Sequence, residues 1–211
     1  MIHHQSLFIS LEGIEGSGKS SQINFIKSEL EKKGYEVLTL REPGGTTFGE
    51  NLRQAILEQK SKLHPLAEMH LFLASRTQLL HEKILPFLSQ PKTAILIDRY
   101  LDSSLVYQGV ARHLGINFVL EQHQVAPLNN FPTRTYYLKI SLETSKKRQA
   151  IRNNKKDYFE LELDQFHEKL IRGFNEVSEL FSSRIKTIDA EKDINQVSAE
   201  ILADLETLIH E

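Results

Sequence analysis

The sequence contains no cysteine among its 211 residues. Without thiols the chain forms no disulfide, performs no thiolate catalysis and binds no metal through sulfur. The absence says nothing about the redox compartment. The nine histidines predict no zinc site either, because they show neither an H-E-x-x-H motif nor a spacing typical of one.

An excess of charge of one sign and long apolar runs are also missing. The 26 basic and 28 acidic side chains leave a net charge of −2, so no basic field points to a nucleic-acid partner. No apolar run approaches the roughly 18–20 residues of a membrane span. Residues 1–6 lack a basic region and Glu12 interrupts the next apolar stretch, so we expect neither a signal peptide nor a membrane partner.

The most specific motif lies between residues 7 and 21. An apolar run precedes the pattern G-x-x-x-x-G-K-[ST], which is that of a phosphate-binding loop. Glycines let backbone N–H groups turn toward phosphate oxygens, and the start of the following helix adds a positive dipole. We therefore expect the loop to bind ATP, Lys19 to reach its β- and γ-phosphates, and Ser20 to ligate Mg²⁺. The expected ATP-binding residues are Gly13, Ile14, Glu15, Gly16, Ser17, Gly18, Lys19, Ser20 and Ser21.

Apolar periodicity alternates between strands and helices along the chain. The expected strands are residues 7–11, 35–40, 93–97, 135–140 and 185–189. The expected helices are residues 19–33, 48–57, 65–88, 102–108, 117–125, 166–181 and 194–209, with a further helix that begins at residue 142 and enters a charged stretch. Such alternation indicates an α/β fold, in which a doubly wound parallel five-stranded sheet of the P-loop NTPase type has helices on both faces. We expect one domain over residues 1–211.

Polar clusters follow three of the expected strands. They are the phosphate-binding loop, residues 41–47, and the pair Asp98–Arg99. Ligands of such sheets bind at the carboxyl ends of the strands, so these clusters indicate one site. Asp98 occupies the usual place of an acid near Mg²⁺. The Arg99 guanidinium can bridge the two anionic groups that phosphoryl transfer brings together.

These motifs give the chain a resemblance to the thymidylate (dTMP) kinase family over nearly its whole length. Any one of them is weak apart from the phosphate-binding loop, but their order along the chain is specific. The resemblance implies transfer of a phosphoryl group from ATP to dTMP with Mg²⁺, giving ADP and dTDP for dTTP synthesis. The segments that carry it are residues 8–20, 41–46, 72–76, 98–109, 166–168 and 188–190.

The resemblance also implies how the base and the sugar are recognised. Phe72 is similar to the aromatic residue that stacks on thymine, and Arg76 to the residue that donates to a thymine carbonyl. Ser104 and Gln108 match the pair that reads the rest of the pyrimidine edge. Tyr107 matches the ring that crowds the 2′ position of the sugar. From the residues alone, Phe72 and Tyr107 are equally typical of packing residues.

Charged residues acquire roles from the same resemblance. Glu15 is similar to the acid near the sugar 3′-hydroxyl and the metal, and Arg53 and Arg99 to the arginines on the acceptor phosphate. Together with Lys19, Glu15 and Arg99 are expected to take part in catalysis. The family also implies a homodimer, and a nucleotide site points to the cytoplasm.

The chain departs from the family in the expected lid, at about residues 148–162. Family members usually carry Asp-Arg there, whereas this chain has Asp157–Tyr158. The variable positions of the phosphate-binding loop lack arginine, and the resemblance implies that such a loop normally relies on a lid arginine to stabilise charge in the transition state. We expect Arg152 to be catalytic, with Arg148 also binding ATP.

Two other functions remain open. The first is a kinase on the same fold that acts on a deoxynucleoside or another monophosphate, with Glu12 or Glu42 as a base. The second is an ATP-driven module without a small phosphate acceptor. Arg53, Arg76 and Arg99 favour a transferase. His167 is expected to be a surface or lid-hinge residue.

Overall fold

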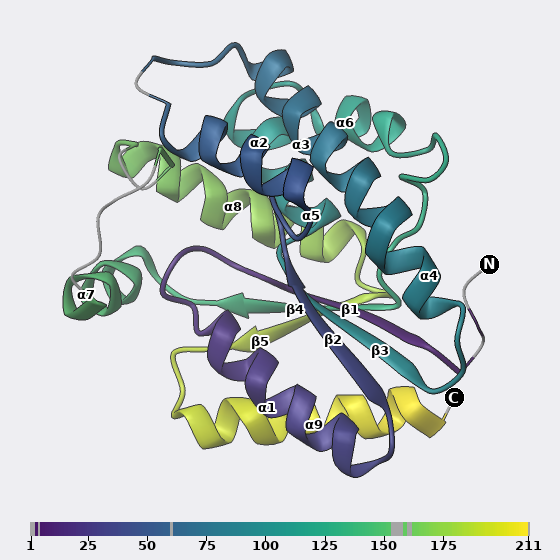
Figure 1. Ribbon diagram of the computed structural model, residues 1–211. Coiled ribbons are helices and arrows are strands. Elements are labelled where there is room, and N and C mark those ends of the chain that lie inside the picture. Colours follow the sequence, from purple (N-terminus) through teal and green to yellow (C-terminus); the bar gives the residue numbers. More distant parts are fainter. Residues whose placement is uncertain (1–2, 4, 60, 153–157, 160–161, 211) are drawn as a thin grey trace.

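A computed structural model describes the chain except for residues 1–2, 4, 60, 153–157, 160–161 and 211. Its centre is a five-stranded parallel sheet with the order β2-β3-β1-β4-β5 (Figure 1). The fold class predicted from the sequence is confirmed. The strands are β1 Leu7–Glu12, β2 Glu36–Arg41, β3 Thr93–Asp98, β4 Arg134–Lys139 and β5 Ile185–Asp189.

The register of the central strands brings their carboxyl ends to one level. Asp98 at the end of β3 is paired with Leu11 of β1 and with Arg41 of β2. Arg41 therefore belongs to β2, whereas the sequence indicated that it begins the next loop. The phosphate-binding loop, Arg41 and Asp98 meet at the same edge of the sheet as a result.

Helices cover both faces of the sheet (Figure 1). Two helices, α1 Lys19–Lys32 and α9 Ile194–His210, contact each other on one face. The opposite face carries α3 Pro65–Leu79, α4 Leu85–Leu88 and α8 Asp164–Leu180. All residues of β1 are buried, and so are the first five of β3. This explains why both strands are apolar runs without alternation.

Two helical segments contain π-helix, which the sequence did not predict. One is η1 Leu80–Ile84, between α3 and α4, and the other is η2 Leu105–Ala111, which follows α5 Leu101–Ser104. The Arg112 N–H donates to the Tyr107 carbonyl oxygen, five residues back, at 2.9 Å. Such widened turns occur frequently at functional sites.

The remaining helices are α2 Thr47–Leu57, α6 Ile116–Gln122 and α7 Leu142–Arg152. Within the described residues, none of the helices combines the length and the apolar character that crossing a membrane requires.

Candidate active site

The loop between β1 and α1 has the backbone conformation of a phosphate-binding loop. Gly13 has a φ angle of 138° and Gly18 one of 98°, and both angles disfavour any residue with a side chain. A Cβ atom on Gly13 would also lie 2.7 Å from the carbonyl oxygen of Leu138 in β4. The loop therefore needs glycine at residue 13 for conformation and for space.

Lys19 is held at the sheet edge beneath this loop. Its Nζ atom donates to the carbonyl oxygens of Gly13 at 3.2 Å and Ile14 at 3.4 Å, and lies 3.9 Å from the Asp98 carboxylate. Burial lowers the pKa of Lys19, and nearby Arg99 lowers it further. Ser20 is exposed in the first turn of α1. A cation thus lies among the backbone carbonyls and N–H groups that surround a phosphate in loops of this kind.

Arg99 links the phosphate-binding loop to the neighbouring helix. It has a φ angle of 66°, in the left-handed region, and its Nη1 atom donates to the Gly13 carbonyl oxygen at 2.9 Å. Its Nη2 atom lies 4.0 Å from the Glu15 carboxylate, and its guanidinium carbon lies 5.2 Å from the centre of the Tyr107 ring. Burial acts to lower the pKa of Arg99, but Tyr107 and three carboxylates outweigh it and raise that pKa.

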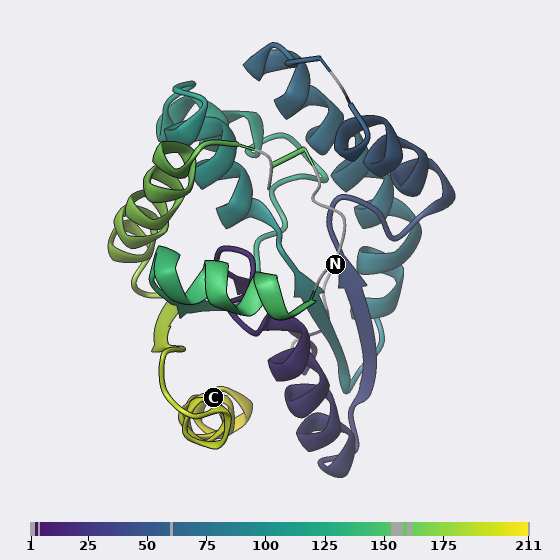
Figure 2. The ribbon, with the colours of Figure 1, turned by 90° about the vertical axis from the view of Figure 1, so that its left-hand side faces the viewer.

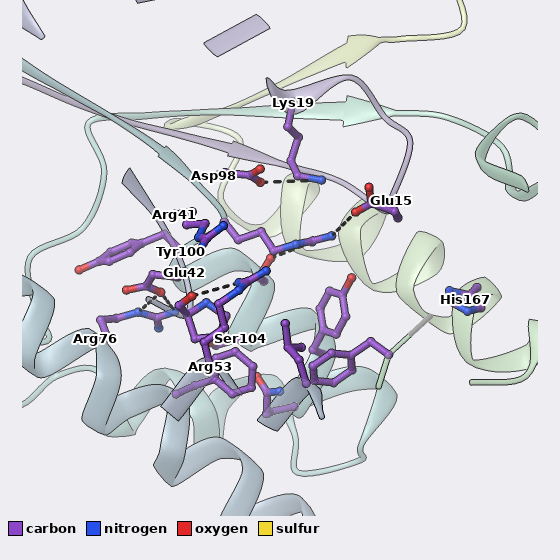
Figure 3. Close-up of a pocket in the computed structure, with 18 residues that line it drawn as sticks. Glu15, Lys19, Arg41, Glu42, Arg53, Arg76, Asp98, Tyr100, Ser104 and His167 are labelled. Atoms are coloured by element: carbon purple, nitrogen blue, oxygen red, sulfur yellow. Dashed lines mark hydrogen bonds and ion pairs between the residues drawn. The ribbon is translucent and has the colours of Figure 1, made fainter. Parts of the chain in front are cut away.

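One pocket brings together the residues expected to bind the acceptor (Figure 3). It extends from Lys19 and Asp98 at the sheet edge to the side chains of α3 and η2. The expected acceptor residues that line it are Glu15, Arg53, Phe72, Arg76, Arg99, Ser104, Tyr107 and Gln108. Sequence reasoning assigned no role to several other lining residues, among them Arg41, Pro43, Leu57, Tyr100, Ser103 and Phe159.

Three aromatic rings, those of Phe72, Tyr107 and Phe159, lie close together among the residues that line the pocket. The Phe159 ring centre lies 5.3 Å from that of Tyr107 and 6.2 Å from that of Phe72. Offset or edge-to-face contacts at such distances stabilise a fixed arrangement of rings. Phe159 lies within the charged lid stretch, where the sequence gives no periodic signal that marks it as a pocket residue. Its role was therefore missed.

Arg76 is fixed by buried partners. It is 1% exposed, and its Nε atom donates to Glu42 Oε2 at 2.7 Å while its Nη1 atom contacts His123 Nε2. The guanidinium carbon also lies 4.6 Å from the Tyr100 ring centre. His123 Nδ1 lies 2.7 Å from the Val119 carbonyl oxygen. Nδ1 must carry the proton for this bond, which leaves Nε2 as an acceptor for Arg76.

The charge state of His123 agrees with this arrangement. Burial, followed by the nearby Arg76 charge, lowers the pKa of His123 to about 3. The imidazole is therefore neutral at physiological pH. His123 belongs to none of the motifs found in the sequence, and Glu42 lies in the 41–46 segment that carries the family resemblance. Neither sequence position indicated that the side chain would contact Arg76.

Glu12, the last residue of β1, has a buried carboxylate that contacts the start of α5. It accepts from the N–H groups of Tyr100 at 2.8 Å and Ser103 at 3.2 Å, and from the Ser103 hydroxyl. Burial and the Asp102 carboxylate raise the pKa of Glu12 to about 7. Because Glu12 holds this helix start and Glu42 pairs with Arg76, the geometry weighs against either carboxylate as a base for an acceptor hydroxyl.

Helix α7 lies against the phosphate-binding loop (Figure 2). The Ser145 hydroxyl donates to the Glu15 carbonyl oxygen at 2.7 Å. Arg148 donates from Nη1 to the Gly16 carbonyl oxygen at 3.1 Å, and from Nη2 to that of Ala190 at 3.0 Å. These contacts place the expected ATP-binding Arg148 beside the loop.

Parts of the expected lid lie outside the described residues. The side chain of Arg152 and all of residues 153–157 belong to these parts. Tyr158 is described, and its hydroxyl accepts from the Leu63 N–H at 3.3 Å. Tyr158, at the position where the family usually has arginine, thus contacts the loop that precedes α3.

His167 on α8 is a lining residue of the pocket, although Figure 3 shows it apart from the labelled arginines. Burial lowers the pKa of His167.

Within the described parts of the chain, no group of three or more histidines and acids could hold a metal ion. Ser20 and Asp98 do offer the oxygen ligands that Mg²⁺ prefers when substrate phosphates supply the rest.

Comparisons with known proteins identify close relatives. The family model described as thymidylate kinase matches residues 11–201. The thymidylate kinase of Thermoanaerobacter sp. (strain X514) is 41% identical over 195 residues, which are 92% of this chain and 95% of the relative. That of Kosmotoga olearia is 38% identical over 208 residues, or 97% of this chain and 99% of the relative.

A solved structure agrees with these sequence relatives. The crystal structure of thymidylate kinase from Ehrlichia chaffeensis superimposes with a TM-score of 0.75 and 25% sequence identity. The match covers 95% of this chain and 98% of the other. With the family model matched over most of its length and relatives near 40% identity across almost all of it, this chain belongs to the thymidylate kinase family.

Proposed function

We propose that this protein transfers the γ-phosphoryl group of ATP to dTMP, giving ADP and dTDP. Family membership carries this reaction to the chain. One structural observation supports it most strongly. A single pocket extends from Lys19 of the phosphate-binding loop to the aromatic rings and buried arginine expected to bind the acceptor. The reacting phosphates of the two nucleotides would meet at the sheet edge.

The chemistry requires little of the protein beyond position and charge. An oxygen of the dTMP phosphate attacks the γ-phosphorus of ATP, the bond from this phosphorus to the β–γ bridging oxygen breaks, and ADP leaves with those electrons. Lys19 would bind the β- and γ-phosphates, while Arg99 bridges the donor and acceptor phosphates. Arg53, whose Nη1 atom donates to the Pro43 carbonyl oxygen at 3.0 Å, would bind the acceptor phosphate.

The acceptor nucleoside would occupy the far part of the pocket. Phe72 would stack on the base, and Arg76, Ser104 and Gln108 would form hydrogen bonds to its edge. Tyr107 would crowd the 2′ position and so favour a deoxyribose. Glu15 would lie near the 3′-hydroxyl, and its approach to Arg99 supports this place between sugar and phosphate.

Mg²⁺ fits the oxygen donors at the sheet edge. The Ser20 hydroxyl and the Asp98 carboxylate would hold it together with phosphate oxygens. When bound, Mg²⁺ neutralises phosphate charge as the transferred group moves. Asp98 would also keep Lys19 in place, as the 3.9 Å separation between them indicates.

The lid would supply a further positive charge. We assign this role to Arg152, with Arg148 helping to bind ATP beside the loop. Arginine fingers contribute about 10³–10⁵ to kcat, so Arg152→Ala should lower kcat strongly. A kcat within about threefold of wild type would contradict the assignment, because that loss is far smaller than an arginine finger contributes. The family further supports a homodimer, and the use of ATP and dTMP supports a cytoplasmic location.

The decisive experiment is ADP release by the purified protein with ATP and Mg²⁺, first without an acceptor and then with dTMP, dUMP, UMP, dCMP, AMP or GMP. Strong stimulation by dTMP supports the proposal. Stimulation by another monophosphate alone would keep the mechanism but contradict the base assignment. Turnover that no nucleotide changes would indicate an ATP-driven module and would leave Arg99 without its role.

A further inference from the structure

Gln108 is connected to a carboxylate behind the pocket. This side chain lines the pocket from η2 and is 1% exposed. Its Nε2 atom donates to Oε1 of Glu68, on α3, at 2.9 Å. Glu68 is fully buried and is not among the residues that line the pocket.

Arg112 keeps this buried carboxylate paired. Its Nε atom donates to Glu68 Oε2 at 3.2 Å, and its Nη1 atom donates to Glu162. The Phe166 ring centre lies 4.7 Å from the guanidinium carbon of Arg112. Burial raises the pKa of Glu68, while the hydrogen bond from Gln108 and the charge of Arg112 oppose that rise. An ionised carboxylate beside a guanidinium can only accept hydrogen bonds.

This pairing determines which way the Gln108 amide faces. Its NH₂ group must point to Glu68, because the reverse orientation would bring the amide oxygen against a carboxylate oxygen. Oε1 then lies on the other side of the amide and is oriented as an acceptor. Thymine and uracil carry a hydrogen on N3, whereas cytosine has a bare N3 acceptor. An oxygen in this orientation favours the first two bases.

We propose that Glu68 is a positioning residue for base selection, which holds the Gln108 amide so that its oxygen accepts from N3–H of the acceptor base. Arg112 supports this by neutralising Glu68. The inference rests on the proposed function, since it assumes a pyrimidine monophosphate in the pocket. It extends that function by assigning part of the selection to a side chain that does not touch the base.

Glu68→Gln tests the inference, because an amide offers both an oxygen and an NH₂ group. Gln108 can then pair with it in either orientation and can present its own NH₂ group to N3 of cytosine. We expect the ratio of kcat/KM for dTMP to that for dCMP to fall by about tenfold or more, which corresponds to about 1.4 kcal/mol. An unchanged ratio, with both values lowered equally, would show that Glu68 is only structural and would overturn the inference.

Glu162→Gln is the matched control. It also removes one carboxylate partner of Arg112 but has no bond to Gln108, so the base preference should stay that of wild type. A shift as large as that of Glu68→Gln would contradict the inference by assigning selectivity to the charge of Arg112.

A second variant addresses folding. Breaking a buried ion pair from one side leaves an uncompensated charge, whereas removing both charges is better tolerated. The double variant Glu68→Gln with Arg112→Met should therefore show the same fall in the ratio if the single variant does not fold. A wild-type protein that no pyrimidine monophosphate stimulates would contradict the proposed function itself, whereas stimulation by dTMP with an unchanged ratio in both variants would contradict only the role of Glu68.

Discussion

At the scale of single residues, the phosphate-binding loop uses glycines for two distinct reasons. Gly13 and Gly18 both have positive φ angles, of 138° and 98°. Of these two, only Gly13 is crowded: a Cβ atom there would lie 2.7 Å from the Leu138 carbonyl oxygen, its nearest neighbour. Gly18 has open space around the corresponding position. Gly18 is therefore required for its backbone conformation alone, whereas Gly13 is required for its conformation and for lack of space.

We expect Gly13→Ala to destabilise the fold more than Gly18→Ala. Both variants carry the backbone cost of a side chain at positive φ, which is roughly 1–2 kcal/mol in the left-handed region. Gly13→Ala adds an overpacking cost of about 1–3 kcal/mol against β4. Urea denaturation of both variants measures the difference. Equal losses of stability would contradict a close approach of this loop to β4.

Glu12 should make the stability of the fold depend on pH. Its pKa is about 7 in the folded protein against an ordinary 4.5. The folded state therefore binds more protons than the unfolded state between these values, and stability falls as pH rises through this window. The difference between about 7 and 4.5 corresponds to about 3 kcal/mol.

Glu12→Gln isolates this contribution because glutamine does not titrate. Relative to the variant, wild type should lose about 3 kcal/mol of unfolding free energy between pH 4 and pH 8. Urea denaturation across the pH range measures both proteins. Curves that run parallel would show that the Glu12 pKa does not rise on folding.

At the scale of elements, the sequence predicted regular strands and missed irregular helices. The five strands could be predicted from the sequence because their apolar residues form continuous runs, as in β1 and β3, or alternate with polar residues. Gly and Pro residues between these segments indicate the turns. The π-helical η2 has the same apolar content as an ordinary helix. It packs against α8 and α6, and local periodicity does not record such tertiary contacts.

Helix α7 offers a test of how an element supports the ATP site. Arg148 bonds to the carbonyl oxygens of Gly16 and Ala190, and each such bond contributes about 0.5–1.5 kcal/mol. Arg148→Ala should therefore raise KM for ATP by about tenfold and leave KM for dTMP nearly unchanged. Steady-state kinetics with each substrate varied in turn measure both constants.

Lys147→Ala is the control on the same helix. Lys147 is 71% exposed and pairs only with exposed Glu143 among the ion pairs of the described residues, so both KM values should stay at wild type. Equal changes in the KM values of ATP and dTMP for Arg148→Ala would contradict a local effect on the phosphate-binding loop.

At the scale of the whole molecule, the pocket joins residues that are far apart in sequence. The clusters after β1, β2 and β3 could be assigned to one site because parallel strands end at the same edge. Buried partners such as His123 and Glu68 could not be assigned to the site from the sequence. Each is an ordinary helical residue by sequence, and its role follows only from the side chain it meets, Arg76 for His123 and Gln108 for Glu68.

The two nucleotides should stabilise the fold additively, because most of their expected residues come from different elements. The ATP site uses mainly the loop after β1, α1 and α7. The acceptor site uses side chains of α2, α3, α5 and η2, and only Glu15 and Arg99 are expected to serve both. A ligand at 100 times its Kd adds about 2.7 kcal/mol, which for a chain of this size raises Tm by roughly 5–10 °C. With a non-hydrolysable ATP analogue and dTMP together, thermal denaturation should show the sum of the two shifts. Phe72→Ala should lose the dTMP shift and keep that of the analogue. A dTMP shift that appears only with the analogue bound would contradict an acceptor pocket already formed before ATP binds.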